Sequence, residues 1–215
     1  MRRLVWSLWL IVVALAVAAV AVYLVTRGSD EAAAPMVPVS TEAAATWAAM
    51  RKPAPPFSLR DEDGRLFSLA SLRGRPVVMT FIDPLCRDYC PTEARRLTDA
   101  AAALPPAQRP TIVAVSVNPY GNAPHILRQD RSKWKLASNW RWGVGDERTL
   151  AGVWKAYHVE VLIQTKKIAG VKVHQIGHTE AAYVIDRTGH QRALFLWPYD
   201  TAGVVRALRG IAAAS

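Results

Sequence analysis

Cys86 and Cys90, four positions apart, are the residues of this sequence best suited to chemistry, and the 215-residue chain contains no other cysteine. Thiolates are nucleophiles and soft metal ligands, so such a pair can close as a disulfide, exchange disulfides with a partner or bind a metal ion. A purely structural disulfide is the plainer alternative. A bridge that closes so small a ring removes little entropy from the unfolded chain, so we expect a chemical use instead.

Pro91, directly after Cys90, limits where the following helix can begin. Proline lacks an N–H and its ring clashes with the preceding turn, so it is tolerated only in the first turn of a helix. We expect Asp88 to be the N-cap, which places Cys90 in the first turn and Cys86 in the loop that folds over it. The helix N-terminus then favours a Cys90 thiolate by about 0.3–1 kcal/mol, whereas Cys86 is the more exposed thiol. Which cysteine attacks a partner stays open.

The elements around the pair predict an α/β fold. An apolar run just before the cysteine loop, residues 76–82, is typical of a central strand buried on both faces. Further strands are expected at 57–59, 66–68, 111–117, 181–185 and 191–196, and helices at 90–103, 122–129, 147–157 and 201–213. This order predicts a sandwich with a mixed central sheet. A cysteine pair where the first buried strand turns into a helix is the thioredoxin-like arrangement.

A metal ion held by two thiolates needs at least one more ligand, and imidazole is a natural third. Soft thiolates suit Cu(I) best, whereas zinc usually takes four ligands and the chain has no second cysteine pair. The five histidines are His125, His158, His174, His178 and His190. We favour His178, with His174 as the backup, because His178 directly precedes the strand at 181–185, whose entry loop faces the cysteine loop in a thioredoxin-like fold. Reductases of that fold carry a cis-proline there, but this chain has no proline between Pro124 and Pro198. The missing proline favours metal binding over general disulfide exchange.

The N-terminal region predicts a membrane anchor. Residues 4–25 carry no charge and follow Arg2 and Arg3. About 20 apolar residues span a bilayer core of about 30 Å as a helix, and basic flanks stay in the cytoplasm. We expect residues 1–26 to anchor the chain, with the rest outside the cytoplasm. A cleaved signal peptide ending near residues 32–34 is the alternative, although such apolar regions usually run only about 7–15 residues.

After the anchor, residues 27–55 are rich in Ala, Pro, Ser and Thr and read as a flexible tether, with a short helix expected at 41–50. The folded domain is expected at 56–215. The net charge of +10 comes from 27 Lys and Arg against 17 Asp and Glu. Nucleic acid is a common partner of basic proteins, but an anchored, extracytoplasmic domain argues against it.

The sequence from about residue 56 to 209 resembles the Sco/SenC family of membrane-anchored, thioredoxin-fold copper-binding proteins. Its Cys86–Thr92 segment is similar to the family's Cys-x-x-x-Cys-Pro motif, and His178-Thr179 with the strand after it is similar to the distal histidine segment. The resemblance implies a copper ion bound by Cys86, Cys90 and His178. It also implies copper delivery, or thiol reduction, for the binuclear copper centre of a cytochrome c oxidase subunit that accepts copper or carries a dithiol.

Two functions therefore compete. A copper metallochaperone passes its ion on by ligand exchange and is not an enzyme in the strict sense. A thiol–disulfide oxidoreductase instead uses Cys86 and Cys90 as a catalytic redox pair on a partner's cysteines. A peroxidase of the peroxiredoxin type is disfavoured, because Met79 and Asp83 occupy the positions where its cysteine motif requires proline.

Overall fold

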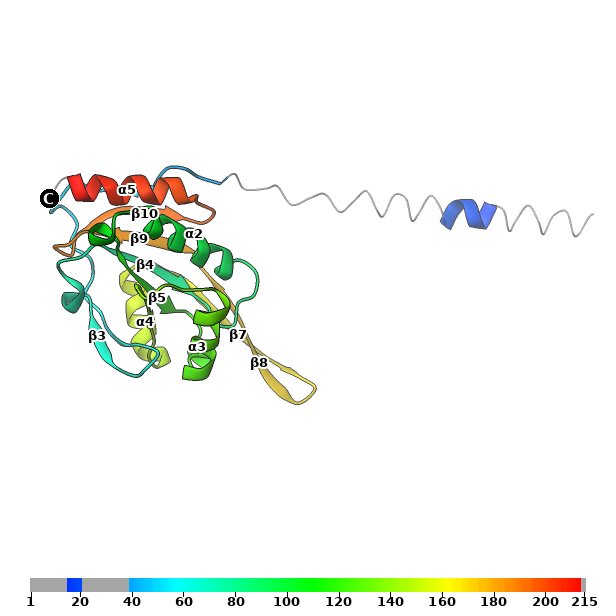
Figure 1. The fold of residues 1–215 in the computed structure, drawn as a ribbon. Coiled ribbons are helices and arrows are strands. Elements are labelled where there is room, and N and C mark those ends of the chain that lie inside the picture. The colour runs from blue at the N-terminus through cyan, green and yellow to red at the C-terminus, as the bar shows by residue number, and fades with distance from the viewer. Residues whose placement is uncertain (1–14, 21–38, 214–215) are drawn as a thin grey trace, which may run out of the picture. The chain divides into compact units, whose positions relative to one another are not determined.

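A mixed sheet of six strands forms the centre of the domain in the computed structural model, which describes residues 15–20 and 39–213 (Figure 1). In spatial order the strands are β1 (Ala45–Thr46), β10 (Gln191–Leu196), β9 (Ala181–Ile185), β4 (Val77–Ile82), β5 (Thr111–Ser116) and β6 (Trp140–Gly143). Strands β4, β5 and β6 run parallel, and β9 pairs antiparallel with β4 and with β10. The strand before the cysteines is thus central, as the apolar run predicts.

Both faces of the sheet are covered, which explains why every residue of β4 is buried. Helices α2 (Cys90–Ala102), α3 (Pro124–Lys133) and α5 (Thr201–Ala213) contribute to the core on one face, together with Val78 and Ile82 of β4. Helix α4 (Glu147–Ala156) and the hairpin of β2 (Ser58–Arg60) and β3 (Leu66–Ser68) pack on the other, against Val77, Met79 and Phe81. Alternating side chains of β4 therefore pack into two separate cores, one on each face of the sheet.

The predicted α/β sandwich with a mixed sheet is confirmed, and most predicted elements lie within a few residues of their expected bounds. Helix α3 is the exception, since it begins at Pro124 and ends at Lys133 rather than covering 122–129. Pro124 suits a helix start because its missing N–H would be unpaired there anyway. Three short 3₁₀ turns, η1 (Ala70–Leu72), η2 (Pro106–Gln108) and η3 (Pro119–Gly121), complete the connections.

A second hairpin, β7 (Val161–Ile168) and β8 (Val171–His178), lies where the sequence analysis predicts no strand. Its turn is Ala169-Gly170, and both residues have positive φ, 47° and 86°. A two-residue turn of this kind matches the twist of paired strands, and Gly170 adopts it without steric cost. The register Ile168↔Val171 continues to Val161↔His178, so His178 stands at the base of the hairpin.

Residues 39–55 pack against the domain and form no helix at 41–50. The prediction of a helix there is wrong. Ala44 N–H donates to Leu194 O at 2.7 Å and Trp47 N–H donates to Arg192 O at 3.0 Å, which seats β1 beside β10. This pairing satisfies backbone groups that an edge strand would otherwise leave open. The compact unit therefore begins at Val39, within the stretch expected to be a tether.

The predicted anchor, residues 1–26, lies outside the described residues except for 15–20, which are helical. Residues 27–38 of the predicted tether lie outside them as well. Within the described ranges, no helix combines the length and the apolar character needed to cross a bilayer.

Candidate functional site

The loop between β4 and α2 brings the two cysteines together. Cys90 is the first residue of α2 and only 1 % exposed, whereas Cys86 is partly exposed in the loop. Both are free thiols. Cys86 N–H donates to Asp83 O at 3.0 Å, and the Asp83 carboxylate accepts a hydrogen bond from the Asn118 side chain at 2.9 Å. The first bond closes a turn within the loop, and the second ties the start of the loop to the β5–η3 segment.

Arg87 fixes the other side of the loop. Its guanidinium donates to Pro84 O at 2.9 Å and Cys86 O at 2.8 Å, and lies 3.4 Å from the buried carboxylate of Asp130 on α3. The guanidinium is thus committed to backbone carbonyls and to Asp130. This side chain links two loop carbonyls by hydrogen bonds, and it ties the loop to α3 by an ion pair with Asp130.

The prediction that Asp88 is the N-cap of α2 is wrong. Tyr89 occupies the N-cap position, and its side chain makes no capping hydrogen bond. The sulfur of Cys86 takes the place of a capping oxygen, because it accepts the Cys90 N–H at 3.5 Å. The first N–H groups of a helix have no partner within the helix, so the loop cysteine itself satisfies one of them. The prediction that Cys90 begins the helix and that Cys86 folds over it is confirmed.

The two thiols differ sharply in acidity. A hydrogen bond from the Cys90 thiol lowers the pKa of Cys86 to about 6, and loop N–H groups add to this effect. The same bond, together with burial, raises the pKa of Cys90 far above its ordinary value. The expectation that the helix start favours a Cys90 thiolate is therefore wrong, since the 0.3–1 kcal/mol of a helix dipole does not offset burial beside a second sulfur. Cys86 is the thiolate at neutral pH.

Two carboxyl groups near the pair were missed by the sequence analysis. Glu93, one turn after Cys90, is 1 % exposed, and its Oε1 accepts hydrogen bonds from Thr80 at 2.6 Å and Tyr199 at 2.7 Å. Within the described residues, its Oε2 has no hydrogen-bond partner. Burial raises the pKa of Glu93 to about 7, and burial with the Cys86 charge raises the pKa of Glu180 to about 7. The spacing of Glu93 from Cys90, on the core-facing side of α2, is the signal that could have found it.

His178 lies at the end of β8 and is partly buried. Its Nδ1 is 3.2 Å from Thr179 O. Burial lowers the pKa of His178, although the charge of Asp83 opposes this shift, so the imidazole is neutral at pH 7. Neutral imidazole is the form that binds metal ions. Among residues 15–20 and 39–213, however, no three Cys, His, Asp or Glu side chains stand close enough to hold a metal ion. The structure gathers the two cysteines and leaves His178 outside a closed three-ligand cluster.

The backup ligand, His174, is engaged elsewhere on the hairpin. Its ring stacks on Tyr120 with centroids 3.6 Å apart and planes 6° apart. Its Nδ1 shares a hydrogen bond of 3.0 Å with the Thr165 hydroxyl. This stack joins the β7–β8 hairpin to the η3 turn. His125 and His158 are exposed.

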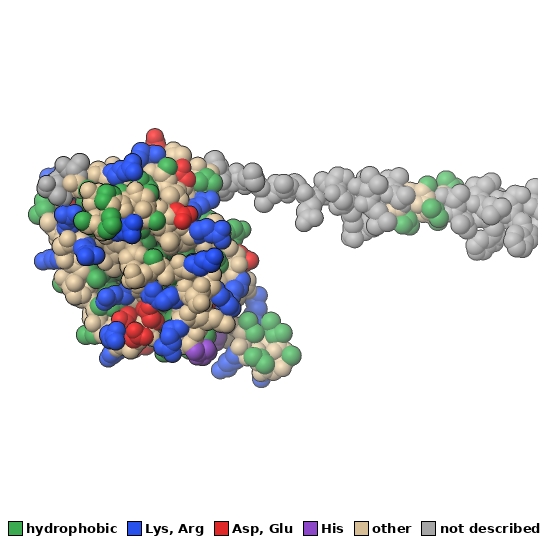
Figure 2. Space-filling view, viewed as in Figure 1, with side chains coloured by type: hydrophobic (Ala, Val, Ile, Leu, Met, Phe, Trp, Pro, Cys, Tyr) green, Lys and Arg blue, Asp and Glu red, His purple; other side chains and the backbone are tan. Residues whose placement is uncertain are grey.

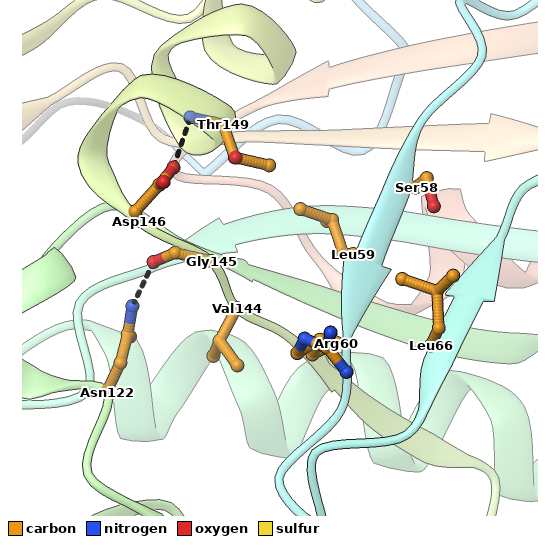
Figure 3. Close-up of a pocket in the computed structure, with 9 residues that line it drawn as sticks. All are labelled: Ser58, Leu59, Arg60, Leu66, Asn122, Val144, Gly145, Asp146 and Thr149. Atoms are coloured by element: carbon orange, nitrogen blue, oxygen red, sulfur yellow. Dashed lines mark hydrogen bonds between the residues drawn. The ribbon is translucent and has the colours of Figure 1, made fainter.

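Figure 3 shows a separate pocket between β2 and the start of α4. Asn122 donates to Gly145 O at 3.2 Å, and Asp146 caps α4 by accepting the Thr149 N–H at 2.7 Å. Its lining holds neither cysteine nor histidine. The pocket is therefore distinct from the dithiol.

Known proteins share this fold. The structure of Bradyrhizobium japonicum ScoI with copper bound has a TM-score of 0.61 at 23 % identity, covering 74 % of this chain and 98 % of that one. BsSco, described as a member of the Sco family of cytochrome c oxidase assembly proteins with a disulfide switch, has a TM-score of 0.60 at 18 % identity, covering 79 % and 99 %. The domain thus has the predicted thioredoxin-like fold.

Sequence comparisons carry the assignment further. The SCO2-like protein RP587 of Rickettsia prowazekii is 26 % identical over 140 aligned positions, and the alignment covers 62 % of this chain. The matched region spans 64 % of that relative's length. A family model described as SCO1/SenC matches residues 48–213, which include the dithiol, the buried Glu93 and His178. With the sheet, the cysteine loop and the histidine hairpin all inside the matched region, the chain belongs to the SCO1/SenC family.

Proposed function

We propose that this protein is a copper metallochaperone that carries a copper ion on Cys86, Cys90 and His178 for the assembly of cytochrome c oxidase. The observation that carries the proposal is the asymmetric dithiol: one thiol is already ionised near neutral pH and a second is hydrogen-bonded to it. Family membership supports the same cargo, because a relative with this fold, ScoI of Bradyrhizobium japonicum, has copper bound.

The donor set fits copper chemically. Cys86 offers a thiolate without losing a proton first, and His178 offers a neutral imidazole. Soft sulfur with imidazole suits Cu(I) better than it suits hard ions such as magnesium. Cys90 must release its proton when its sulfur binds a metal ion, so uptake is expected to release protons and to strengthen as pH rises.

Movement of the hairpin completes the site in this proposal. His178 stands at the base of β8, and the charge of Asp83, three residues before Cys86, acts on its imidazole. The hairpin is held to the η3 turn by the stack of His174 on Tyr120. A shift at the base of the hairpin brings His178 over the thiols. A partner's thiolates then displace the three ligands in turn and take the ion.

A competition titration tests the proposal. The reduced full chain is titrated anaerobically with Cu(I) against a chromogenic chelator, beside the variants Cys86→Ser, Cys90→Ser and His178→Ala. Each is expected to lose at least about tenfold in affinity, since even residues that only support a ligand cost 10- to 100-fold when removed. His125→Ala, an exposed histidine on α3, is the control and should bind as the native chain does. Absence of Cu(I) uptake, or equal binding by the two histidine variants, rules out this ligand set.

Thiol–disulfide exchange is a second candidate, favoured by the low pKa and partial exposure of Cys86. The Cys86 thiolate attacks one sulfur of a partner disulfide and the other sulfur leaves as a thiolate. Cys90, once deprotonated, attacks the Cys86 sulfur, which releases the reduced dithiol partner and leaves a Cys86–Cys90 disulfide. The assignment of Cys86 as the attacking thiol follows from its acidity.

Trapping separates the two candidates. With a disulfide-bonded test peptide, Cys90→Ser should accumulate the mixed disulfide and Cys86→Ser should form none. Exchange that is rapid and unaffected by His178→Ala, in a chain that takes up no Cu(I), would favour the oxidoreductase.

Both candidate functions include anchoring through residues 1–26, with the domain outside the cytoplasm. The uncharged stretch at 4–25, behind Arg2 and Arg3, supports this anchoring.

A further inference from the structure

The distal half of the β7–β8 hairpin projects away from the rest of the domain (Figure 1). Near its base, Val161, Ile163 and Ile176 pack against the core that Val77, Met79 and Phe81 share with α4 and the β2–β3 hairpin. From Lys166 to Val173, by contrast, every residue is exposed. The tip therefore gains no burial from the fold, and its composition needs another explanation.

The strand register gathers apolar side chains on the tip. Ile168 pairs with Val171 and Lys166 with Val173, and alternate residues of a strand share one face, so Ile168, Val171 and Val173 lie together. They are 57 %, 64 % and 42 % exposed. Figure 2 shows apolar side chains gathered at the end of the hairpin, with basic side chains beside them. An apolar cluster on a projecting turn is typical of a surface that is covered in use.

The charge of the hairpin is all of one sign. Residues 161–178 contain Lys166, Lys167 and Lys172 and no Asp or Glu. Within the described part of the chain, none of these lysines makes an ion pair, and only Lys166 bonds a side chain, that of Gln175 at 3.1 Å. Lys167 stands directly opposite Lys172. Like charges facing each other across a strand pair destabilise it, so the fold itself gains nothing from this pair.

We propose that the hairpin tip, residues 166–173, docks on a bilayer surface that carries anionic lipid. Ile168, Val171 and Val173 enter the headgroup boundary. Lys166, beside Val173, and the Lys167–Lys172 pair on the opposite face contact lipid phosphates. One face of the tip is mainly apolar and the lysines flank it, an arrangement that suits the boundary between hydrocarbon and headgroups. A convex tip also suits a fluid surface, which needs no preformed groove.

Hydrogen exchange on the full chain in lipid nanodiscs tests the docking. Discs of phosphatidylcholine alone are compared with discs containing about one third phosphatidylglycerol. Amides of residues 166–173 should exchange more slowly only in the anionic discs, and raised salt should remove the difference. Each lysine near an anionic surface strengthens binding about fivefold, so Lys166→Gln/Lys167→Gln/Lys172→Gln should abolish the protection.

A matched triple variant, Lys133→Gln/Lys135→Gln/Lys155→Gln, removes the same charge elsewhere on the domain and should keep the protection. Ile168→Ser/Val171→Ser should lose it with the lysines intact. Equal exchange in both discs, or protection that survives the hairpin lysine changes, overturns the proposal. Protection that appears in phosphatidylcholine discs only when purified cytochrome c oxidase is added also overturns it, in favour of a protein partner. Copper affinity is measured on the same variants and is expected to be unchanged, so failure here is separable from failure of the metal proposal.

Discussion

The pKa values of the two neighbouring thiols shift in opposite directions, because the thiol of Cys90 donates a hydrogen bond to the sulfur of Cys86. Cys90 is buried at the helix start and keeps its proton, and that proton stabilises the Cys86 thiolate. Any ligand or disulfide chemistry at this site therefore begins at Cys86. The proton of Cys90 is the one that must be removed before both sulfurs can act.

Alkylation measures this asymmetry directly. With iodoacetamide at pH 7, Cys86 should react and Cys90 should not, and the pH profile of the Cys86 rate should have its midpoint near 6. Cys90→Ala removes the donor, so the midpoint should move up toward the ordinary thiol range. Cys90→Ser keeps an O–H donor and should shift it less. Peptide mass spectrometry reads both sites, and faster labelling of Cys90 would contradict the assignment.

Glu93 links the dithiol to the stability of the domain. Its pKa of about 7 lies above that of an unfolded glutamate, so the native state holds this proton more tightly. The resulting stability is fully present below about pH 4.5 and is lost as the pH rises through about 7. The unpartnered Oε2 explains the direction, since ionising the group leaves charge on a buried oxygen without a donor.

Glu93→Gln should remove that pH dependence, because the amide keeps an acceptor for Thr80 and Tyr199 but does not ionise. The free energy of unfolding of the native chain should fall, relative to the variant, by on the order of 3 kcal/mol between pH 4.5 and 8. Urea unfolding of the reduced proteins across this range measures the difference. Glu160→Gln, at an exposed position, is the control and should follow the native curve. Parallel curves for native and Glu93→Gln would contradict the assignment.

At the scale of elements, the β2–β3 hairpin sits on the sheet through a close approach at β6. A Cβ on Gly143 would lie 2.8 Å from Leu59 Cδ1, and Leu59 is fully buried. Gly152, on the exposed side of α4, has open space around it. The packing of Leu59 therefore requires glycine at position 143, whereas the space around position 152 admits a larger residue.

Replacing each glycine by alanine should change stability in opposite directions. Gly143→Ala overpacks the contact with Leu59 and should lower the free energy of unfolding by about 1–3 kcal/mol. Gly152→Ala should raise it by about 0.5–1 kcal/mol, because alanine loses less backbone entropy in a helix. Urea unfolding midpoints compare the two. A rise in the free energy of unfolding for both variants would show that the β2–β6 contact adjusts freely.

At the scale of the whole molecule, the segment 39–55 closes one edge of the sheet. Strand β1 pairs with β10, Ala54 is buried, and Pro55 O accepts the Tyr157 hydroxyl at 2.8 Å. These contacts join the segment to a strand, to the second core and to the residue after α4. The boundary of the cooperative unit is therefore set by contacts that are distant in sequence.

Truncation distinguishes the two possible starts of the domain. A chain beginning at residue 39 should unfold at the same temperature as the native domain. A chain beginning at residue 56 leaves β10 as an open edge and should lose about 3 kcal/mol or more, given that each lost hydrogen bond costs about 1 kcal/mol, and should self-associate. Calorimetry and light scattering measure both effects. Equal stability of the two chains would show that residues 39–55 add nothing to the folded domain, as expected if 27–55 is a tether.

The sequence by itself determined what depends on local pattern: strands β4, β5, β9 and β10 of the central sheet, the closing helix at 201–213, and a cysteine pair at a helix start marked by Pro91. Strand β6 was not predicted. The β7–β8 hairpin escaped prediction because its strands pair with each other and stay largely exposed, so apolar alternation is confined to short stretches such as Val171–Val173. Likewise, neither the burial of Glu93 nor the pairing of β1 has a local signature. Tertiary structure alone decided which sulfur is ionised, because the acidity of each thiol depends on burial and on a hydrogen bond that form only when loop, helix and sheet come together.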